Sequence, residues 1–181
     1  MAEALRAQDL AKEGTAAYRS ARFAEAAALF SQAAHAYASS GQALDCAEAN
    51  NNASVAYLQA GDAAAALKSA EGSDKIFADA KDQRRQGMAL GNQAAALEAL
   101  NRLDEALNLY NQSAQLLKAS GETEMRASVL KSISALQIRT GNQLQALASM
   151  DAALQNQKRL SLRERILQKL LRIPIDMLNR R

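Results

Sequence analysis

The chain of 181 residues is 49% hydrophobic and 23% charged, contains eight glycines and one proline, and carries a formal net charge of +3. So few glycines and prolines leave little material for strands joined by turns or for long loops, which predicts an all-helical protein of ordinary domain size. A single cysteine excludes an intramolecular disulfide, and no segment approaches the length of a membrane span. Because the N-terminal stretch also lacks an apolar run, we expect no secretory signal and a cytoplasmic protein.

The hydrophobic pattern predicts paired helices along the first 157 residues. We expect four helical hairpins, over 1–40, 41–80, 81–120 and 121–157, with helices in the first two at about 3–20, 23–39, 42–60 and 63–80. The third hairpin shows the pattern most clearly, because Leu103, Leu107, Tyr110 and Leu117 form one apolar face. Small residues interrupt that face and would let a neighbouring helix come close.

Steps of forty residues connect positions of the same kind. From Ala106 they reach Ala26, Ala66 and Ala146, so all four hairpins carry alanine at this place. Other steps connect the turn residues Ala21, Gly61, Asn101 and Gly141, the largely leucine set Leu10, Asn50, Leu90 and Leu130, and the small set Gly14, Ser54, Ala94 and Ser134. A fixed period of this size is the signature of a helical solenoid.

These positions resemble the tetratricopeptide repeat (TPR) motif, in which a large residue is followed by a small one, a turn, an alanine and then an aromatic or large residue. Leu90, Ala94, Asn101, Ala106 and Tyr110 occupy those places in the third repeat. The resemblance implies an all-α, right-handed α-solenoid of stacked antiparallel helix pairs, to which residues 158–181 add a C-terminal amphipathic helix. The family's usual repeat has about 34 residues, so we expect the excess here to form extra helical turns.

In this family the concave face, formed mainly by the first helix of each repeat, binds ligands. The resemblance therefore implies a non-enzymatic scaffold that holds a peptide or helix of a partner protein in its concave groove. The family's contact places correspond in this sequence to Thr15, Tyr18, Arg19, Asn51, Asn52, Val55, Gln59, Met88, Asn92, Glu98, Lys131, Ile138 and Arg139. A subclass that clamps a C-terminal carboxylate needs two Lys, an Arg and two Asn, and the better frame here supplies only Asn92 and Lys131. We do not expect that role.

Two stretches inside predicted helices are unusual. The three asparagines at 50–52 have poor helix propensity. Either their side chains bridge neighbouring helices or face water, or some of them bind a peptide backbone. In the fourth predicted helix, the sequence Glu-Gly-Ser at 71–73 indicates either close packing at a cost in helix propensity or a kink.

Residues 158–181 depart from the repeat pattern. They include eight basic and two acidic residues, a net charge of +6, so the rest of the chain carries −3. Ser161 and Glu164 form a predicted capping box that starts a helix, and Pro174 should bend or end that helix. One face is predicted to be apolar, while Arg163, Lys169 and Arg172 lie mostly elsewhere. The apolar residues are Leu162, Ile166, Leu167, Leu170 and Ile173.

Two interpretations of this C-terminal helix stay open. Its apolar face could cover the last repeat, because a terminal repeat needs a cap with a polar outer side. Alternatively, the helix binds an anionic membrane surface or an acidic partner, through contacts at Arg163, Ile166, Lys169, Leu170, Arg172 and Ile173. A third hypothesis is self-association, in which short solenoids stack end to end to form a homo-oligomer.

Catalytic and cofactor roles find little support in the sequence. There is one histidine, His35, and one cysteine, Cys46, with no pair of ligand types at metal spacing and no phosphate-binding glycine loop. We expect no cofactor and no metal. Nucleic-acid binding ranks below protein binding, because the solenoid is slightly acidic and the basic segment has no aromatic residues for stacking on bases.

Overall fold

The computed structural model describes residues 2–157 and 159–179, with side chains described over 5–157 and 159–171. Every regular element in these ranges is an α-helix. In chain order they are α1 (Ala2–Arg19), α2 (Phe23–Ser39), α3 (Ala43–Gln59), α4 (Ala63–Ala70), α5 (Ser73–Asp79), α6 (Gln83–Ala99), α7 (Leu103–Ala119), α8 (Thr123–Arg139), α9 (Gln143–Gln155) and α10 (Leu162–Asn179). None of them is long and apolar enough to cross a bilayer.

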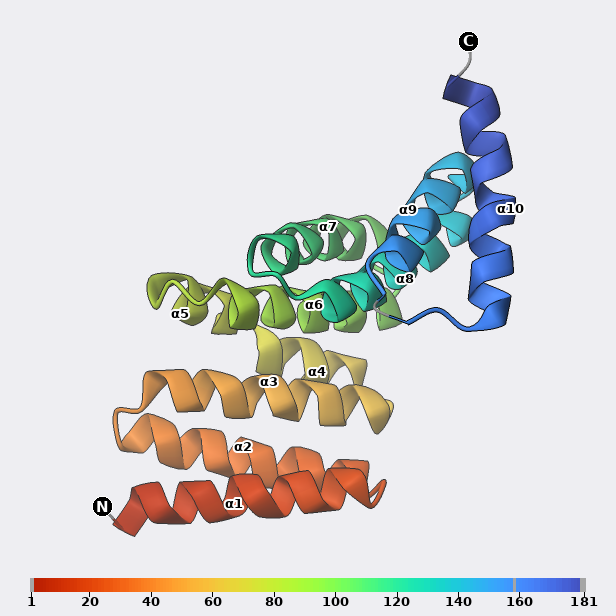
Figure 1. The fold of residues 1–181 in the computed structure, drawn as a ribbon. Coiled ribbons are helices and arrows are strands. Elements are labelled where there is room, and N and C mark those ends of the chain that lie inside the picture. The colour runs from red at the N-terminus through yellow and green to blue at the C-terminus, as the bar shows by residue number, and fades with distance from the viewer. Residues whose placement is uncertain (1, 158, 180–181) are drawn as a thin grey trace.

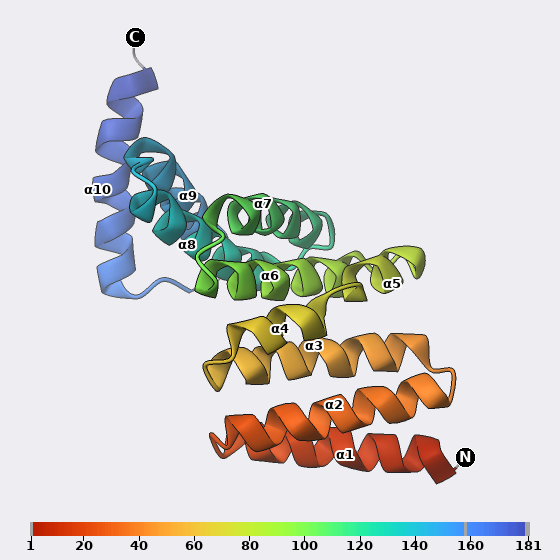
Figure 2. The ribbon, with the colours of Figure 1, turned by 180° about the vertical axis from the view of Figure 1, so that it is seen from behind.

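Each helix packs mainly against its neighbours in sequence, which spreads the chain into an extended stack (Figure 1). The N-terminus lies at one end of the stack and the C-terminus at the other. Seen from either side, α10 lies along the outside of the α8–α9 pair (Figure 2). The architecture is therefore the predicted all-α solenoid, in which each element touches only near neighbours.

The forty-residue step is confirmed by where the helices begin. α2, α4, α7 and α9 start at Phe23, Ala63, Leu103 and Gln143, and α3, α6 and α8 start at residues 43, 83 and 123. The turns between helices recur every twenty residues, twice in each forty-residue repeat. A residue with positive φ stands at 21, 41, 61, 81, 101, 121 and 141, and the following N–H donates to the carbonyl five residues earlier at each of them, as in the 2.9 Å bond from Arg22 to Ala17. One helix-ending motif therefore closes every helix from α1 to α8, apart from the break between α4 and α5.

The small residues that recur every forty positions lie at helix contacts. Ala26, Ala66 and Ala106 are 0% exposed and Ala146 is 2% exposed. Buried serines at related positions donate hydrogen bonds to carbonyls of the facing helix, from Ser113 to Gly87 at 2.6 Å, from Ser134 to Ala146 at 2.8 Å and from Ser73 to Ala47 at 3.4 Å. Short side chains thus let the backbones approach closely enough for these bonds to form.

The helix predicted over 63–80 is two helices in the structure. Gly72 adopts φ +81°, which separates α4 from α5, so the unusual stretch at 71–73 is a break. The break leaves the Ala70 carbonyl without the N–H it would have met in a continuous helix. Buried Gln93 of α6 supplies the missing donor at 3.0 Å and also donates to Asp74 at 2.9 Å. This amide satisfies both sides of the break.

The C-terminal helix begins as predicted. The Ser161 backbone N–H and hydroxyl donate to Glu164 at 2.9 and 2.8 Å, and the Glu164 N–H donates back to the Ser161 hydroxyl at 3.3 Å. Of the two effects predicted for Pro174, a bend or an end of the helix, the end is wrong, because α10 continues to Asn179. The predicted apolar face is also not the packed one. Leu171 is buried at 8% exposure, whereas Leu162 and Ile166 are 74% and 53% exposed.

Candidate partner-binding face

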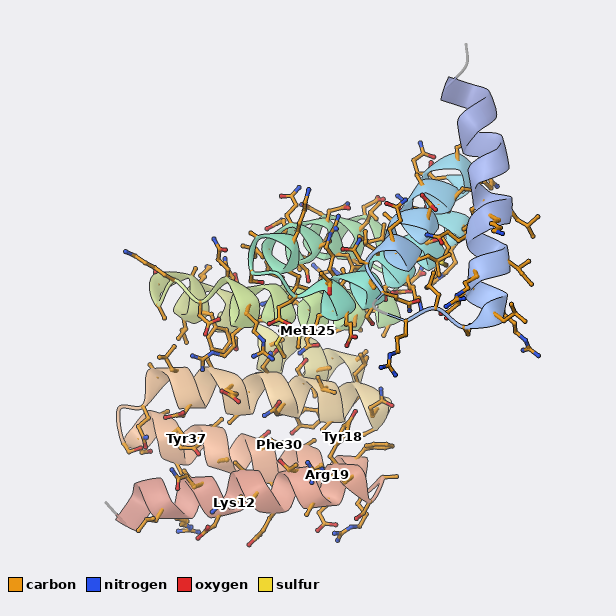
Figure 3. All side chains as sticks on the ribbon, in the orientation of Figure 1. Lys12, Tyr18, Arg19, Phe30, Tyr37 and Met125 are labelled. Carbon is orange, nitrogen blue, oxygen red and sulfur yellow. The ribbon has the colours of Figure 1, made fainter. Side chains whose placement is uncertain are left out.

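The first helices of the successive pairs, α1, α3, α6 and α8, form one side of the stack, here called the first-helix face. A hollow lies between each neighbouring pair of these helices, and side chains from the second helices reach its floor. The hollow between α1 and α3 has a volume of about 200 Å³ and is lined by Thr15, Tyr18, Phe30, Asn52 and Val55. Figure 3 shows Phe30 between Tyr18 and Tyr37 along this end of the stack.

The hollow between α3 and α6 is more polar. Its volume is about 350 Å³, and its lining comprises Glu48, Asn51, Asn52, Phe77, Arg84, Arg85 and Met88. The Arg85 guanidinium lies 5.1 Å from the centre of the Phe77 ring, at a distance typical of a cation–π contact. Phe77 belongs to α5, the helix that follows the break at Gly72, and its ring forms the floor of this hollow.

The hollow between α6 and α8, like that between α1 and α3, is mainly apolar. It has a volume of about 340 Å³ and is lined by Gly87, Met88, Gly91, Asn92, Ala95, Tyr110, Ser113, Leu117, Met125, Ser128, Val129 and Ser132. Glycine is needed for its shape. A Cβ atom at Gly87 would meet the Leu117 side chain at 3.0 Å, and one at Gly91 would meet the Ser113 hydroxyl at 3.2 Å. The absent side chains leave the hollow open down to α7.

Charged side chains on this side of the stack pair between successive repeats. Arg85 contacts Glu48 at 3.2 Å, Arg84 contacts Glu122 at 2.9 Å, and Arg139 contacts Glu98 at 2.8 Å. These side chains remain partly exposed, so each pair contributes little to stability. These pairs matter more for partner recognition, because the charged groups nearest the hollows are already neutralised by opposite charges within the chain.

Two groups at these contacts have displaced pKa values. Burial raises the pKa of the Tyr110 hydroxyl, and the adjacent Glu98 carboxylate raises it further, so Tyr110 stays a neutral donor to Glu98 at 3.1 Å. The pKa of Asp82 is lowered, first by the Arg85 backbone N–H that its carboxylate caps at 2.9 Å and then by the Arg85 guanidinium. Both groups hold one protonation state over the neutral range, so each keeps its hydrogen bond to a residue, Glu98 or Arg85, that forms an inter-repeat ion pair.

Comparison with known proteins places this geometry in a structural class. No protein-family model matches the sequence, and no curated protein matches it. The structure is similar to the crystal structure of a candidate kinesin light chain of Podosopora anserina with nearly identical TPR-like repeats, at 16% identity and a TM-score of 0.56, covering 95% of this chain and 96% of that chain. The fold is TPR-like.

A variant of that protein, in which one glutamine is replaced by methionine, gives the same identity and TM-score with both chains covered completely. At 16% identity the similarity establishes the TPR-like fold, which was also implied by the motif in the sequence. The stacked helix pairs of this chain are thus a TPR-like repeat scaffold. Its site must be argued from its own residues.

The TPR-like stack brings several of the predicted contact residues to the hollows. Those that line a hollow are Thr15, Tyr18, Asn51, Asn52, Val55, Met88 and Asn92. The others lie elsewhere. Arg19, Gln59 and Ile138 are exposed without lining a hollow, Glu98 and Arg139 pair with each other, and Lys131 contacts Glu164 of α10 at 3.4 Å. Their part in binding stays a prediction.

The asparagines at 50–52 divide between the two interpretations. Asn51 is 7% exposed and accepts a hydrogen bond from Asn92 at 2.9 Å, so it bridges α3 and α6. Asn50 donates to the sulfur of Cys46 within its own helix at 3.7 Å. Asn52 is exposed, lines two hollows, and makes no side-chain hydrogen bond among the described residues. Of the three, only Asn52 has an amide free to meet a peptide backbone.

Several residues that shape the hollows are absent from the predicted contact set. Tyr110 and Ser113 belong to a second helix and still line the α6/α8 hollow, and Gly91 leaves room beside the Ser113 hydroxyl. Arg84 and Arg85 lie one turn before the family's usual contact places. The glycines at 87 and 91 were the available signal, since two of them within a predicted helix indicate a close approach.

The residues considered for chemistry do not form a reactive site. His35 is exposed and Cys46 is half-buried, and burial raises the pKa of the Cys46 thiol, which disfavours the reactive thiolate. Within the described ranges, no three His, Cys, Asp or Glu side chains are grouped to hold a metal ion.

Proposed function

We propose that this chain is a protein-binding scaffold and that its first-helix face holds a peptide or helix of a partner protein. The observation that carries the proposal is the series of three hollows, one between each pair of neighbouring first helices. A segment lying across these helices would meet all three in turn. Each hollow, of about 200 to 350 Å³, is large enough to accept a side chain of such a segment.

The chemistry of the hollows indicates which segment fits. The α6/α8 hollow presents Met88, Met125 and Val129 to an apolar side chain, and methionine adapts its shape to different occupants. Asn52 offers an amide to a peptide backbone between the first two hollows. Since the neighbouring charges are paired within the chain, a strongly charged segment would have to compete with those pairs. We therefore expect a segment rich in apolar side chains and low in charge.

Affinity in this arrangement comes from several modest contacts. Burying one large apolar side chain contributes roughly 1.5–3 kcal/mol, part of which offsets the lost freedom of the segment on binding. A single filled hollow therefore binds weakly, whereas two or three filled by one segment bind usefully. Blocking any one of the three hollows should therefore weaken binding.

Selection from a displayed random-peptide library against the immobilised full chain tests this proposal. Ser128→Phe places a ring in the α6/α8 hollow from an exposed position of α8, and Asn52→Ala removes the free amide. We expect selected peptides to carry spaced apolar residues and to lose about tenfold or more in affinity for Ser128→Phe. Gln115→Phe, an exposed position of α7 that lines none of the three hollows, is the matched control and should leave affinity unchanged. Failure to select any peptide, or equal binding by Ser128→Phe, would contradict the proposal.

A further inference from the structure

The C-terminal helix α10 packs on the solenoid with one side and presents an apolar stripe on the opposite side. Its packed side holds the partly buried Glu164 and Gln168 and the buried Leu171. The stripe consists of Leu162, Ile166 and Leu170, which are 74%, 53% and 58% exposed. Since residues four apart on a helix are displaced by about 40°, these three leucine and isoleucine side chains fall within an arc of about 80°.

A polar cluster fixes α10 in this rotation. Glu164 accepts from Ser161 at the helix start and from Lys131 of α8 at 3.4 Å. With the Gln157 amide oriented to satisfy both neighbours, its nitrogen donates to Glu164 at 3.1 Å and its oxygen accepts from Lys131 at 2.6 Å. Turning the stripe inward would break this cluster and expose Leu171. The outward stripe is therefore part of the packed structure.

Cations flank the stripe on both sides. Helical periodicity places Arg165 and Lys169 along one edge and Arg163 along the other, and all three are exposed. Arg159, just before the helix, is exposed as well. Among the α10 positions whose side chains are described, 162–171, the one acidic residue is Glu164, which lies on the packed side and is paired with Lys131. The surface around the stripe is consequently both apolar and positively charged.

The charge and shape of this surface favour one occupant. A second copy of the chain would bring the same cations against each other, which opposes α10–α10 pairing. In both views α10 is the outermost element at its end of the stack, with α8 and α9 on one side only (Figures 1 and 2). Its stripe is thus a ridge open to a flat surface, whereas a partner helix packs best in a groove between two helices.

We infer that α10 binds the surface of a membrane rich in anionic lipids, with Leu162, Ile166 and Leu170 entering the headgroup boundary. The flanking arginine and lysine side chains extend along the apolar stems and place their charges at the lipid phosphates. Such a helix lies in the interface plane and does not cross the bilayer. This contact uses the end of the stack and leaves the first-helix face open, so it is independent of the peptide-binding proposal.

Flotation of the full chain with lipid vesicles tests this inference. We expect binding to phosphatidylcholine vesicles containing phosphatidylserine, little binding to phosphatidylcholine alone, and weaker binding as salt screens the charges. The stripe variant Ile166→Ser with Leu170→Ser should reduce the partition coefficient about tenfold or more. The charge variant Arg163→Gln with Lys169→Gln should reduce it about thirtyfold on anionic vesicles.

The matched control changes two leucines of similar exposure elsewhere. Leu5 and Leu144 are 59% and 58% exposed, so Leu5→Ser with Leu144→Ser removes as much exposed apolar surface without touching α10. It should bind vesicles as the parent does. Because all these positions are exposed, circular dichroism should report the same melting temperature for each variant.

Four outcomes would overturn the inference. One is the absence of flotation with anionic vesicles at low salt. Another is equal loss of binding in the control pair. The third is that the chain fails to bind vesicles but binds a synthetic amphipathic peptide of leucine and glutamate, and that the stripe variant abolishes this peptide binding. That result would assign the surface to an acidic protein helix. A concentration-dependent mass that the stripe variant abolishes would likewise assign it to a second copy.

Discussion

The first and second halves of the stack pack with different side chains while keeping the same helix arrangement. Between α1 and α3 the buried contacts are made largely by alanine, with Phe30 and Tyr37 as the main large residues. Between α6 and α9 the core contains Leu97, Leu130, Ile133 and Leu136 around Tyr110. One backbone period is therefore compatible with two packing solutions, provided that small residues remain at the closest contacts.

This difference in packing predicts which changes of side-chain volume each half tolerates. An alanine interface holds its helices so close that added volume has nowhere to go, whereas a leucine interface loses dispersion contacts and leaves a cavity when a side chain is shortened. The N-terminal half should therefore resist enlargement and the C-terminal half truncation. Substitutions that enlarge a side chain in the N-terminal half and shorten one in the C-terminal half test this difference.

The largest effect is expected from shortening the core of the C-terminal half. Leu136 is 0% exposed in the cluster between α6 and α9. Leu136→Ala should lower the free energy of unfolding by about 3 kcal/mol, because it removes buried apolar surface and leaves a cavity. Urea unfolding followed by circular dichroism measures this. Leu144→Ala, at 58% exposure, should change stability by less than about 0.5 kcal/mol, and a similar loss in both variants would mean that Leu136 is not a core residue.

A somewhat smaller effect is expected from enlarging the N-terminal half. Ala53 of α3 is 0% exposed among Ala17, Ala27 and Ala56. Ala53→Leu should destabilise by about 2 kcal/mol, because the inserted methyl groups force neighbouring side chains or helices apart. Ala28→Leu, at an exposed position of α2, provides the control for helix propensity. Unchanged stability of Ala53→Leu would show that the alanine interface has spare volume and would remove the contrast between the halves.

The turns provide a finer version of the same comparison. Ala21 and Gly141 occupy equivalent turns in the first and last pairs, with φ of 57° and 79°. A Cβ atom is disfavoured in this conformation, so Ala21→Gly should stabilise by about 0.5 kcal/mol and Gly141→Ala should destabilise by about 1 kcal/mol. Nothing lies within 4 Å of a Cβ added at Gly141, so the backbone alone is tested. Thermal unfolding of both variants should show shifts of opposite sign, and shifts of the same sign would refute the shared turn geometry.

The smallest and most local effect concerns acidity at the end of the C-terminal half. The Ser161 backbone N–H and hydroxyl, followed by Lys131, lower the pKa of Glu164 from about 4.5 to about 2. A lowered pKa in the folded state means that the contact is fully stabilising above pH 4.5 and is lost as the pH falls toward 2. Hydrogen-exchange protection of α10 should therefore decrease over that range while that of α7 is retained. Glu164→Gln should show the weakened protection at neutral pH, and a variant protected like the parent would mean that the cluster does not hold α10.

Much of the fold could be predicted because it depends on local pattern. The positions of Ala26 and its equivalents, the turn residues and the capping box at Ser161 all act through side chains close in sequence. They gave the boundaries of the first three helices to within about a residue, whereas the helix expected over 63–80 is divided at Gly72. The hollows themselves were not predicted. The resemblance to the TPR motif named Asn52 and Met88 as contact residues, and both line hollows in the structure.

The remaining features depended on residues distant in sequence. Gln93 satisfies the break at Gly72 from another helix, and Arg139 is withdrawn from the face by Glu98, which lies one repeat earlier. For α10 the sequence left two interpretations open. The one in which its apolar face covers the last repeat does not hold for Leu162, Ile166 and Leu170, because Lys131 and Gln157 hold the opposite side, at Glu164, against the solenoid.

The sequence by itself determined the forty-residue period, the all-helical class and the helix ends, because these depend on spacing, propensity and small residues at regular intervals. Only the tertiary structure decided which side chains of the first-helix face stay available, where the hollows open, and which side of α10 faces outward. Those properties follow from contacts between side chains of different helices, which the local pattern of the sequence does not specify.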